Sequence, residues 1–172
     1  MPRFIILYIR YVEAVNRVAG HIAMYGIFVM LGILFYSAIT RSVFNAPQHW
    51  TIEMAQFTMA AYYLLGGGWT LKNGAHVRMD LFYERWTLRK RAFMDTLTAV
   101  CIITYLIVLL YGGISSTEYA IKYGQKNYSA WAPPMAPIKI IMTVGILLML
   151  LQAIAIFFRD LATVLGKRID ES

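Results

Sequence analysis

The sequence predicts an all-α membrane protein with four transmembrane helices and with both the N- and the C-terminus in the cytoplasm. Three observations support this prediction. The 172 residues are 59% hydrophobic and 15% charged, whereas a soluble domain is about 45–50% apolar and about 25% charged. Four stretches long enough to cross a bilayer contain no Asp, Glu, Lys or Arg. The basic residues are also concentrated in alternate connecting segments, which sets the orientation.

The composition excludes several other classes of protein. A water-soluble globule could not bury so many apolar residues, and a disordered chain would not be 15% aromatic. The net charge of +7 does not indicate a nucleic-acid-binding protein, because the basic residues are absent from long stretches of the chain. The single cysteine, Cys101, permits neither an internal disulfide nor a metal cluster. We expect it to be a small buried hydrophobe.

The four uncharged stretches are residues 18–40, 54–71, 96–117 and 140–158, which contain 23, 18, 22 and 19 residues. The hydrocarbon layer of a bilayer is crossed by about 20 residues of helix, within a range of roughly 17–25. Because lipid offers no hydrogen bonds to the backbone, each stretch is expected to be an α-helix. Residues 1–172 are therefore interpreted as a single integral membrane domain.

The orientation follows from the distribution of Lys and Arg between the connecting segments. The N-terminal segment, the loop after the second span and the C-terminal tail together hold twelve of these residues, and the other two loops hold four. Basic loops remain in the cytoplasm during membrane insertion. Both termini and the loop between the second and third spans are therefore predicted to be cytoplasmic.

Two segments outside the spans are expected at the cytoplasmic surface. Arg3, Arg10 and Arg17 recur every seven residues, so they form one stripe of a helix whose remaining surface is largely apolar. This pattern is typical of an amphipathic helix lying on the membrane, and a direct cytoplasmic extension of the first span is an equal alternative. Residues 76–86 interleave charged, apolar and aromatic side chains, which predicts an interfacial segment.

The residues do not indicate catalytic or ion-coupling chemistry. The three histidines, His21, His49 and His76, fall in different parts of the predicted topology and cannot converge as a haem pair. Catalytic and phosphate-binding motifs are missing from the sequence. All nine acidic residues lie outside the four spans, whereas ion-coupled transporters carry ionisable groups within the membrane. We expect no enzymatic activity, no cofactor, and a role in supporting another membrane protein.

Small residues within the spans are candidates for close helix packing, because they let helix backbones approach each other. They occur near the end of the second span and in the third span: Gly66, Gly67, Gly68, Gly112, Gly113 and Ser116. Packing within the four-helix unit and packing against a partner subunit are both open for each position.

The end of the second span resembles a known family. Residues 65–80 read Leu-Gly-Gly-Gly-Trp-Thr-Leu-Lys-Asn-Gly-Ala-His-Val-Arg-Met-Asp. They contain a His-x-Arg-x-Asp element, formed by His76, Arg78 and Asp80, shortly after Gly74. This stretch is similar to the small membrane subunit (DctQ type) of tripartite ATP-independent periplasmic (TRAP) transporters.

Further points of resemblance extend over roughly residues 15–162. They are the acidic Glu53 that opens the second span, a basic turn before the third span, the Trp/Pro-rich outer loop before the fourth, and Gln152 late in the last span. In such systems a periplasmic binding protein captures an organic anion, commonly a carboxylate or a related acid. A large membrane subunit then moves the anion, driven by the sodium gradient.

The resemblance implies a brace for the large subunit in the cytoplasmic (inner) membrane of a bacterium or archaeon. It implies as partners the large TRAP membrane subunit, the periplasmic substrate-binding protein and the lipid bilayer, and it implies no nucleic acid. Sodium is expected to bind the large subunit and not this chain. The alternatives are an autonomous small four-helix transporter or channel and a membrane assembly protein without a transport function.

Two groups of residues are candidates for specific roles beyond packing. Gly74, His76, Arg78 and Asp80 are interpreted as a cytoplasmic clasp in which Asp80 accepts hydrogen bonds from Arg78 or from a backbone turn. The alternative is an interfacial turn with solvated charges, since an exposed ion pair contributes only about 0–1 kcal/mol.

The second group is expected at the outer interface. Arg41 ends the first span and Glu53 begins the second on the same side of the membrane, so we hypothesise that they pair. Trp131, Pro133 and Pro134 are candidates for a surface that docks the binding protein. Anchoring of these aromatic and proline residues to lipid headgroups is the competing interpretation.

Overall fold

The computed structural model describes residues 3–46, 48–73 and 88–164. These residues form four α-helices, which are α1 (Arg3–Val43), α2 (His49–Lys72), α4 (Leu88–Lys122) and α5 (Ala136–Val164). In the described part of the chain no segment forms a β-strand, and one isolated antiparallel bridge joins two loop residues. The prediction of an all-helical protein is confirmed.

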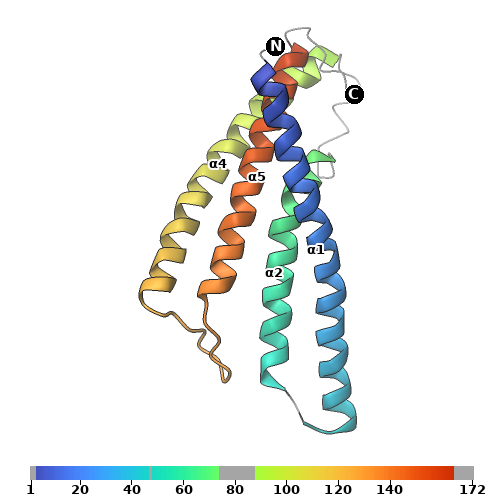
Figure 1. Cartoon of the computed structure of the whole chain (residues 1–172), viewed down its shortest axis with the longest axis vertical. Coiled ribbons are helices and arrows are strands. Elements are labelled where there is room, and N and C mark those ends of the chain that lie inside the picture. The colour runs from blue at the N-terminus through green and yellow to red at the C-terminus, as the bar shows by residue number, and fades with distance from the viewer. Residues whose placement is uncertain (1–2, 47, 74–87, 165–172) are drawn as a thin grey trace.

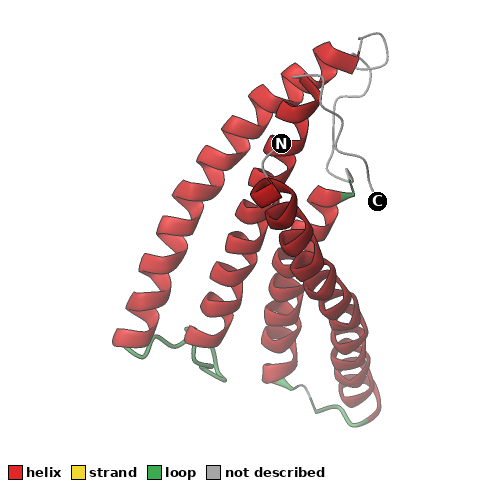
Figure 2. Cartoon of the chain, turned by 45° about the horizontal axis from the view of Figure 1, so that its top comes forward, coloured by secondary structure: helices red, strands yellow, loops and turns green. Residues whose placement is uncertain are grey.

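The helices form one layer in the order α4, α5, α2, α1, and toward the inner end α1 crosses over α5 (Figure 1). α5 packs against α4 and α2, α2 packs against α5 and α1, and α1 also reaches α5. The loops from α1 to α2 and from α4 to α5 lie at one end of the layer (Figure 2). We call this the outer end and the opposite one the inner end, following the orientation predicted from the charges.

Three of the four helices are long and apolar enough to cross a membrane, namely Phe4–Val43 in α1, Met94–Lys122 in α4 and Ala136–Ala162 in α5. α2 does not reach the same level of hydropathy, although its 24 residues extend about 36 Å. Three glycines and polar side chains such as Gln56 lower its hydropathy. The fourth span therefore stays a prediction, supported by the position of α2 between α1 and α5.

α1 is a single helix of 41 residues, so the residues before the first predicted span continue it directly. Ile9 and Val12 are buried, and they pack with Ala155 of α5. Around this contact lie partly buried side chains that include Tyr8 and Phe158. Because this apolar face is covered by α5, the structure favours the extension of the first span over a separate helix on the membrane surface.

A second apolar core joins α4 to α5. Its buried members are Leu106, Ile146, Leu150 and Ala153. α5 is the main neighbour of α4, and Cys101 lies on the exposed part of the α4 surface. The expectation that Cys101 is buried is therefore wrong: α4 packs mainly on α5, and many of its apolar residues face outward.

Candidate functional site

A cluster of charged side chains joins three helices at the inner end. The Glu13 carboxylate of α1 lies 2.9 Å from Lys72 Nζ of α2 and 2.9 Å from Arg159 Nη2 of α5. The Glu13 and Lys72 side chains are 16% and 17% exposed, and that of Arg159 is 34% exposed. Partial burial reduces screening by salt and water, so this cluster holds α1, α2 and α5 more firmly than a surface ion pair would.

A pair of amide side chains lies next to the ion pairs and deeper between the helices. Asn16 Nδ2 of α1 donates a hydrogen bond to Gln152 Oε1 of α5 at 2.9 Å and another to the Val12 carbonyl oxygen at 3.2 Å. The Asn16 side chain is fully buried, and Gln152 is 1% exposed. A buried amide is costly unless it is hydrogen-bonded, so the pair favours one relative position of α1 and α5.

Gly68 of α2 provides the space for this amide pair. A Cβ atom at this position would overlap the Asn16 carboxamide. The Asn16 Oδ1 atom that faces Gly68 is the one buried side-chain polar atom of the described residues that lacks a hydrogen-bond partner. A Cα–H of Gly68 is the weak donor available to it, and such contacts recur where helices pack closely. We call Glu13, Asn16, Lys72, Gln152 and Arg159 the inner polar cluster.

Gly66 and Gly67, the other two glycines of α2 that were predicted to allow close helix packing, also contact helices of this chain. Gly66 lies opposite Ala23 of α1, where an added Cβ would be 3.8 Å from the Ala23 Cβ. Gly67 is buried against Met149 of α5. The three consecutive glycines therefore let α2 approach helices on both of its sides.

The small residues of α4 divide between two environments. An added Cβ at Gly113 would lie 3.2 Å from Thr143 Oγ1, so Gly113 packs against α5. Gly112 has open space around it, and Ser116 is exposed. Both line a groove of about 610 Å³ between α2, α4 and α5. Gly112 and Ser116 therefore remain candidates for contact with a partner.

The predicted pair of Arg41 and Glu53 is not formed at the outer end. Glu53 is 8% exposed, and its carboxylate accepts a hydrogen bond of 3.4 Å from Asn127 Nδ2 of the α4–α5 loop. Arg41 is exposed, and within the described part of the chain it forms no ion pair with Glu53. The two residues lie at the same end of the layer, but Glu53 faces the α4–α5 loop instead of the end of α1.

The α4–α5 loop folds into a short hairpin. The Asn127 N–H donates to the Pro133 carbonyl at 3.0 Å, and the Met135 N–H donates to the Gln125 carbonyl at 2.9 Å. Trp131 is 44% exposed and Pro134 is exposed, whereas Pro133 is buried. Trp131 and Pro134 can therefore contact a partner or lipid, while Pro133 supports the hairpin from within.

The predicted cytoplasmic clasp lies outside the described residues. This applies to Gly74, His76, Arg78 and Asp80 and to the whole interfacial segment 76–86. The role of these residues stays a prediction.

Sequence reasoning missed Glu13 and Asn16, which precede the first uncharged stretch. The sequence did contain an indication of their role, because Glu13 follows Ile9 and Asn16 follows Val12 by one helical turn. Both polar residues therefore lie on the apolar face of the helix. A polar residue on the apolar face of a helix is expected to have a buried partner. Gln152 was noted only as a point of family resemblance.

A sequence model of the family described as tripartite ATP-independent periplasmic transporters, DctQ component, matches residues 30–163. This match covers α2, α4, most of α5 and the outer part of α1. The chain belongs to this family. No curated protein matches the chain. As a DctQ component, it is a small membrane component of a TRAP transporter and a multi-pass protein of the inner membrane.

Proposed function

We propose that this DctQ component is a non-catalytic brace for the large membrane subunit of a sodium-driven TRAP transporter of organic anions, such as carboxylates or related acids. The observation that supports this proposal is the exposed face of α4. α4 packs against α5 and leaves apolar side chains exposed along its length. They include Leu97, Val100, Ile102, Tyr105, Ile107, Val108, Tyr111, Ile114 and Ile121.

A surface of this kind can receive a transmembrane helix. Gly112 lies in its middle with no atom within 4 Å of an added Cβ, and a small residue lets a second helix approach closely. The inner polar cluster supports the same role, since it links three helices into one unit. A brace must resist deformation while the large subunit moves.

The test compares two glycines with open space around them, Gly112 in α4 and Gly32 in α1. The DctQ component is co-expressed with a large subunit and a binding protein, and co-purification and sodium-dependent uptake of carboxylates are measured. Gly112→Leu is expected to lower both about tenfold, because the added side chain separates the helices. Gly32→Leu is the matched control and is expected to leave both unchanged.

Two outcomes would contradict the proposal in different ways. Equal co-purification of both variants would exclude α4 as the contact surface. Solute uptake by liposomes that contain the DctQ component alone would support an autonomous transporter instead of a brace.

We also propose that the exposed tip of the outer hairpin contacts the periplasmic binding protein. Trp131→Ala is expected to weaken binding of that protein to the assembled membrane subunits, while Trp131→Phe keeps an aromatic ring and serves as the control. Co-purification of the large subunit is expected to stay constant. Unaltered binding in Trp131→Ala would favour the lipid-anchor interpretation.

The cytoplasmic clasp completes the proposal. Asp80→Ala is expected to lower the yield of the complex with the large subunit, because the carboxylate would no longer hold the turn in place. Co-purification and uptake that match the unmodified protein would refute a role of Asp80 in assembly.

A further inference from the structure

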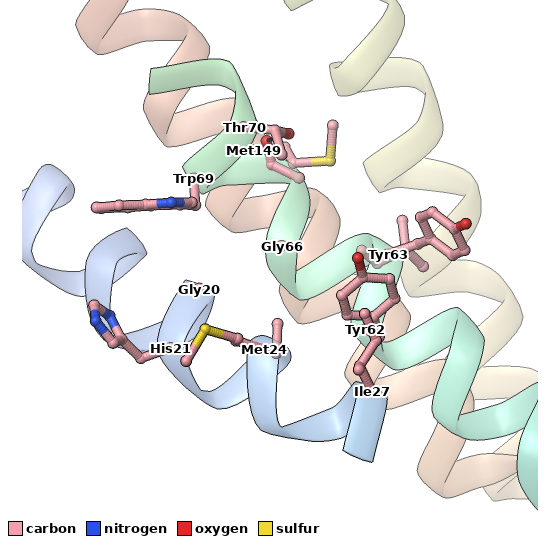
Figure 3. Close-up of a pocket in the computed structure, with 13 residues that line it drawn as sticks. Gly20, His21, Met24, Ile27, Tyr62, Tyr63, Gly66, Trp69, Thr70 and Met149 are labelled. Carbon is pink, nitrogen blue, oxygen red and sulfur yellow. Dashed lines mark hydrogen bonds between the residues drawn. The ribbon is translucent and has the colours of Figure 1, made fainter. Parts of the chain in front are cut away.

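An open groove lies between α1 and α2 in the inner half of the layer. Its volume is about 670 Å³, and Met149 of α5 contributes to its lining. Trp69 and His21 stand near one end, and Ile27 and Tyr62 near the other (Figure 3). The groove is distinct from the one beside Gly112, which lies on the other side of α2 between α4 and α5.

Small residues on both walls create this groove. An added Cβ at Gly20 would lie 2.9 Å from the Trp69 Cβ, so the indole packs directly on the α1 backbone. Gly66 and Ala23 face each other farther along. The walls are otherwise mostly apolar, and Met24 and Tyr62 are among the larger side chains that line them.

The groove lies at the membrane level of the first part of a phospholipid acyl chain, next to the headgroup. On α1 it runs from Gly20 to Ile27, a rise of about 10 Å along the helix axis. Gly20 lies close to the start of the predicted first span at residue 18, which marks the edge of the hydrocarbon layer. The groove therefore leads from the headgroup level into the hydrocarbon of the inner leaflet.

Basic and aromatic side chains surround the mouth of the groove. The His21 ring contacts the Trp69 ring edge to face, with 6.0 Å between centroids. Lys72 Nζ lies 5.7 Å from the centroid of the Trp69 ring. Arg17 is exposed one helical turn from His21 toward the inner end, and it forms no ion pair with a described residue.

The carboxylate of Glu13 does not cancel the positive charge of the two cations that it contacts. Glu13 contacts two cations, Lys72 and Arg159, so these three side chains keep a net charge of +1. Arg17 adds a second positive charge at the level where lipid phosphates lie. A transmembrane helix of a partner would have to present an acid at this position, whereas every anionic phospholipid presents its phosphate there.

We propose that the groove between α1 and α2 binds an anionic phospholipid of the inner leaflet. One acyl chain occupies the apolar groove along Met24 and Ile27, and the phosphate lies beside Arg17 and His21. Trp69 lies between the acyl chain and the phosphate, in keeping with the preference of Trp for the membrane interface. Basic residues next to a membrane attract anionic headgroups. This proposal is independent of the brace function.

The first test measures lipid retention by native mass spectrometry of the full chain, purified in mild detergent with any subunits that accompany it. The added lipid is phosphatidylglycerol or, for comparison, phosphatidylcholine. Arg17→Gln is expected to lower phosphatidylglycerol retention about fivefold, the effect of losing one cation near the headgroup. Arg41→Gln removes the same charge at the outer end and is expected to leave retention unchanged.

A second pair of variants tests the groove itself. Met24 and Met59 are 49% and 45% exposed, but only Met24 lines this groove. Met24→Trp fills the space and is expected to lower phosphatidylglycerol retention, whereas Met59→Trp is expected to have no effect. Equal retention in Met24→Trp and Met59→Trp, or equal retention of both lipids by the unmodified chain, would overturn the proposal.

Fluorescence gives a readout that does not depend on the purity of the detergent complex. A variant with Phe in place of Trp50, Trp86 and Trp131 leaves Trp69 as the single indole. Brominated phosphatidylglycerol in mixed vesicles is expected to quench Trp69 more than brominated phosphatidylcholine at the same mole fraction. Equal quenching would overturn the proposal. So would a photo-crosslinker at position 24 that reacts in the intact transporter with another protein subunit instead of lipid.

Discussion

The inner and outer ends of the helix layer are held together in different ways. At the inner end, charged and amide side chains from three helices meet in one cluster. At the outer end, hydroxyl pairs join neighbouring helices two at a time: Thr51 with Ser37 at 3.0 Å, and Thr117 with Thr143 at 2.9 Å. Polar side chains therefore join three of the four helices at the inner end, whereas at the outer end they join the helices as two pairs.

The contact between the two helix pairs at the outer end is weak by comparison. The hydrogen bond of 3.4 Å from Asn127 to Glu53 joins the α4–α5 loop to α2. Between these pairs runs the groove beside Gly112. A polar cluster thus positions helices where water and headgroups are near, while an apolar groove leaves room for another helix where lipid is the solvent.

The largest expected effect comes from the glycine beside Asn16. Gly68→Ala places a Cβ against the Asn16 carboxamide and is expected to lower the free energy of unfolding by about 1–3 kcal/mol, as overpacking does. Gly66→Ala, two residues away, meets Ala23 at an ordinary contact distance of 3.8 Å and is expected to be neutral or slightly stabilising. Thermal unfolding in detergent measures both. Equal losses would mean that the inner end is not closely packed.

The next effect concerns the ion pairs. Glu13→Gln leaves Lys72 and Arg159 without their shared carboxylate and is expected to cost about 1–2 kcal/mol of unfolding free energy. This is less than the cost of breaking a fully buried pair, because both cations are partly exposed. Glu118→Gln removes an exposed acid of α4 and serves as the control. Similar stability of the two variants would show that the ion pairs of Glu13 do not stabilise the inner end.

A smaller coupling is expected between the two amides. A double-mutant cycle of Asn16→Ala and Gln152→Ala is expected to give a coupling energy of about 0.6–1 kcal/mol, the range typical of polar contacts between membrane helices. Chemical unfolding of the four proteins measures it. A coupling near zero would show that the buried amides stabilise the layer through separate contacts.

The smallest effect is expected at the outer end. Glu53→Gln keeps an oxygen that can accept the long hydrogen bond from Asn127, so it is expected to change the unfolding free energy by less than about 0.5 kcal/mol. A cycle of Arg41→Gln with Glu53→Gln is expected to show no coupling. A coupling above about 1 kcal/mol would show that Arg41 and Glu53 do pair, and that an ion pair stabilises the outer end as well as the inner end.

The sequence predicted the helical elements well because their signal is local. Uncharged stretches located the cores of α1, α4 and α5, and the structure lengthens each of them with helical turns that carry charged residues. The family resemblance around residues 65–80 was confirmed by the match to the DctQ component. Both inferences depend on neighbours in the chain and not on contacts between distant residues.

The candidate site depended on contacts that no local pattern records. Glu13 and Arg159 are 146 positions apart, and their meeting requires α1 to cross α5. The pairing of Arg41 with Glu53 was inferred from their shared side of the membrane, which says nothing of the direction in which each side chain points. Cys101 was assigned to the interior for a related reason, since lipid and a protein core select the same apolar residues.

Composition and charge by themselves determined that this chain is helical and lies in a membrane, because lipid excludes unpaired backbone groups wherever the chain crosses it. The motif in residues 65–80 pointed to the family, and the match of the DctQ model to residues 30–163 shows it. Only the tertiary structure decided which face of each helix meets another helix and which stays open. The physical reason is that helix rotation is fixed by a few small and polar residues, such as Gly68 and Asn16, whose effect exists only after distant helices come together.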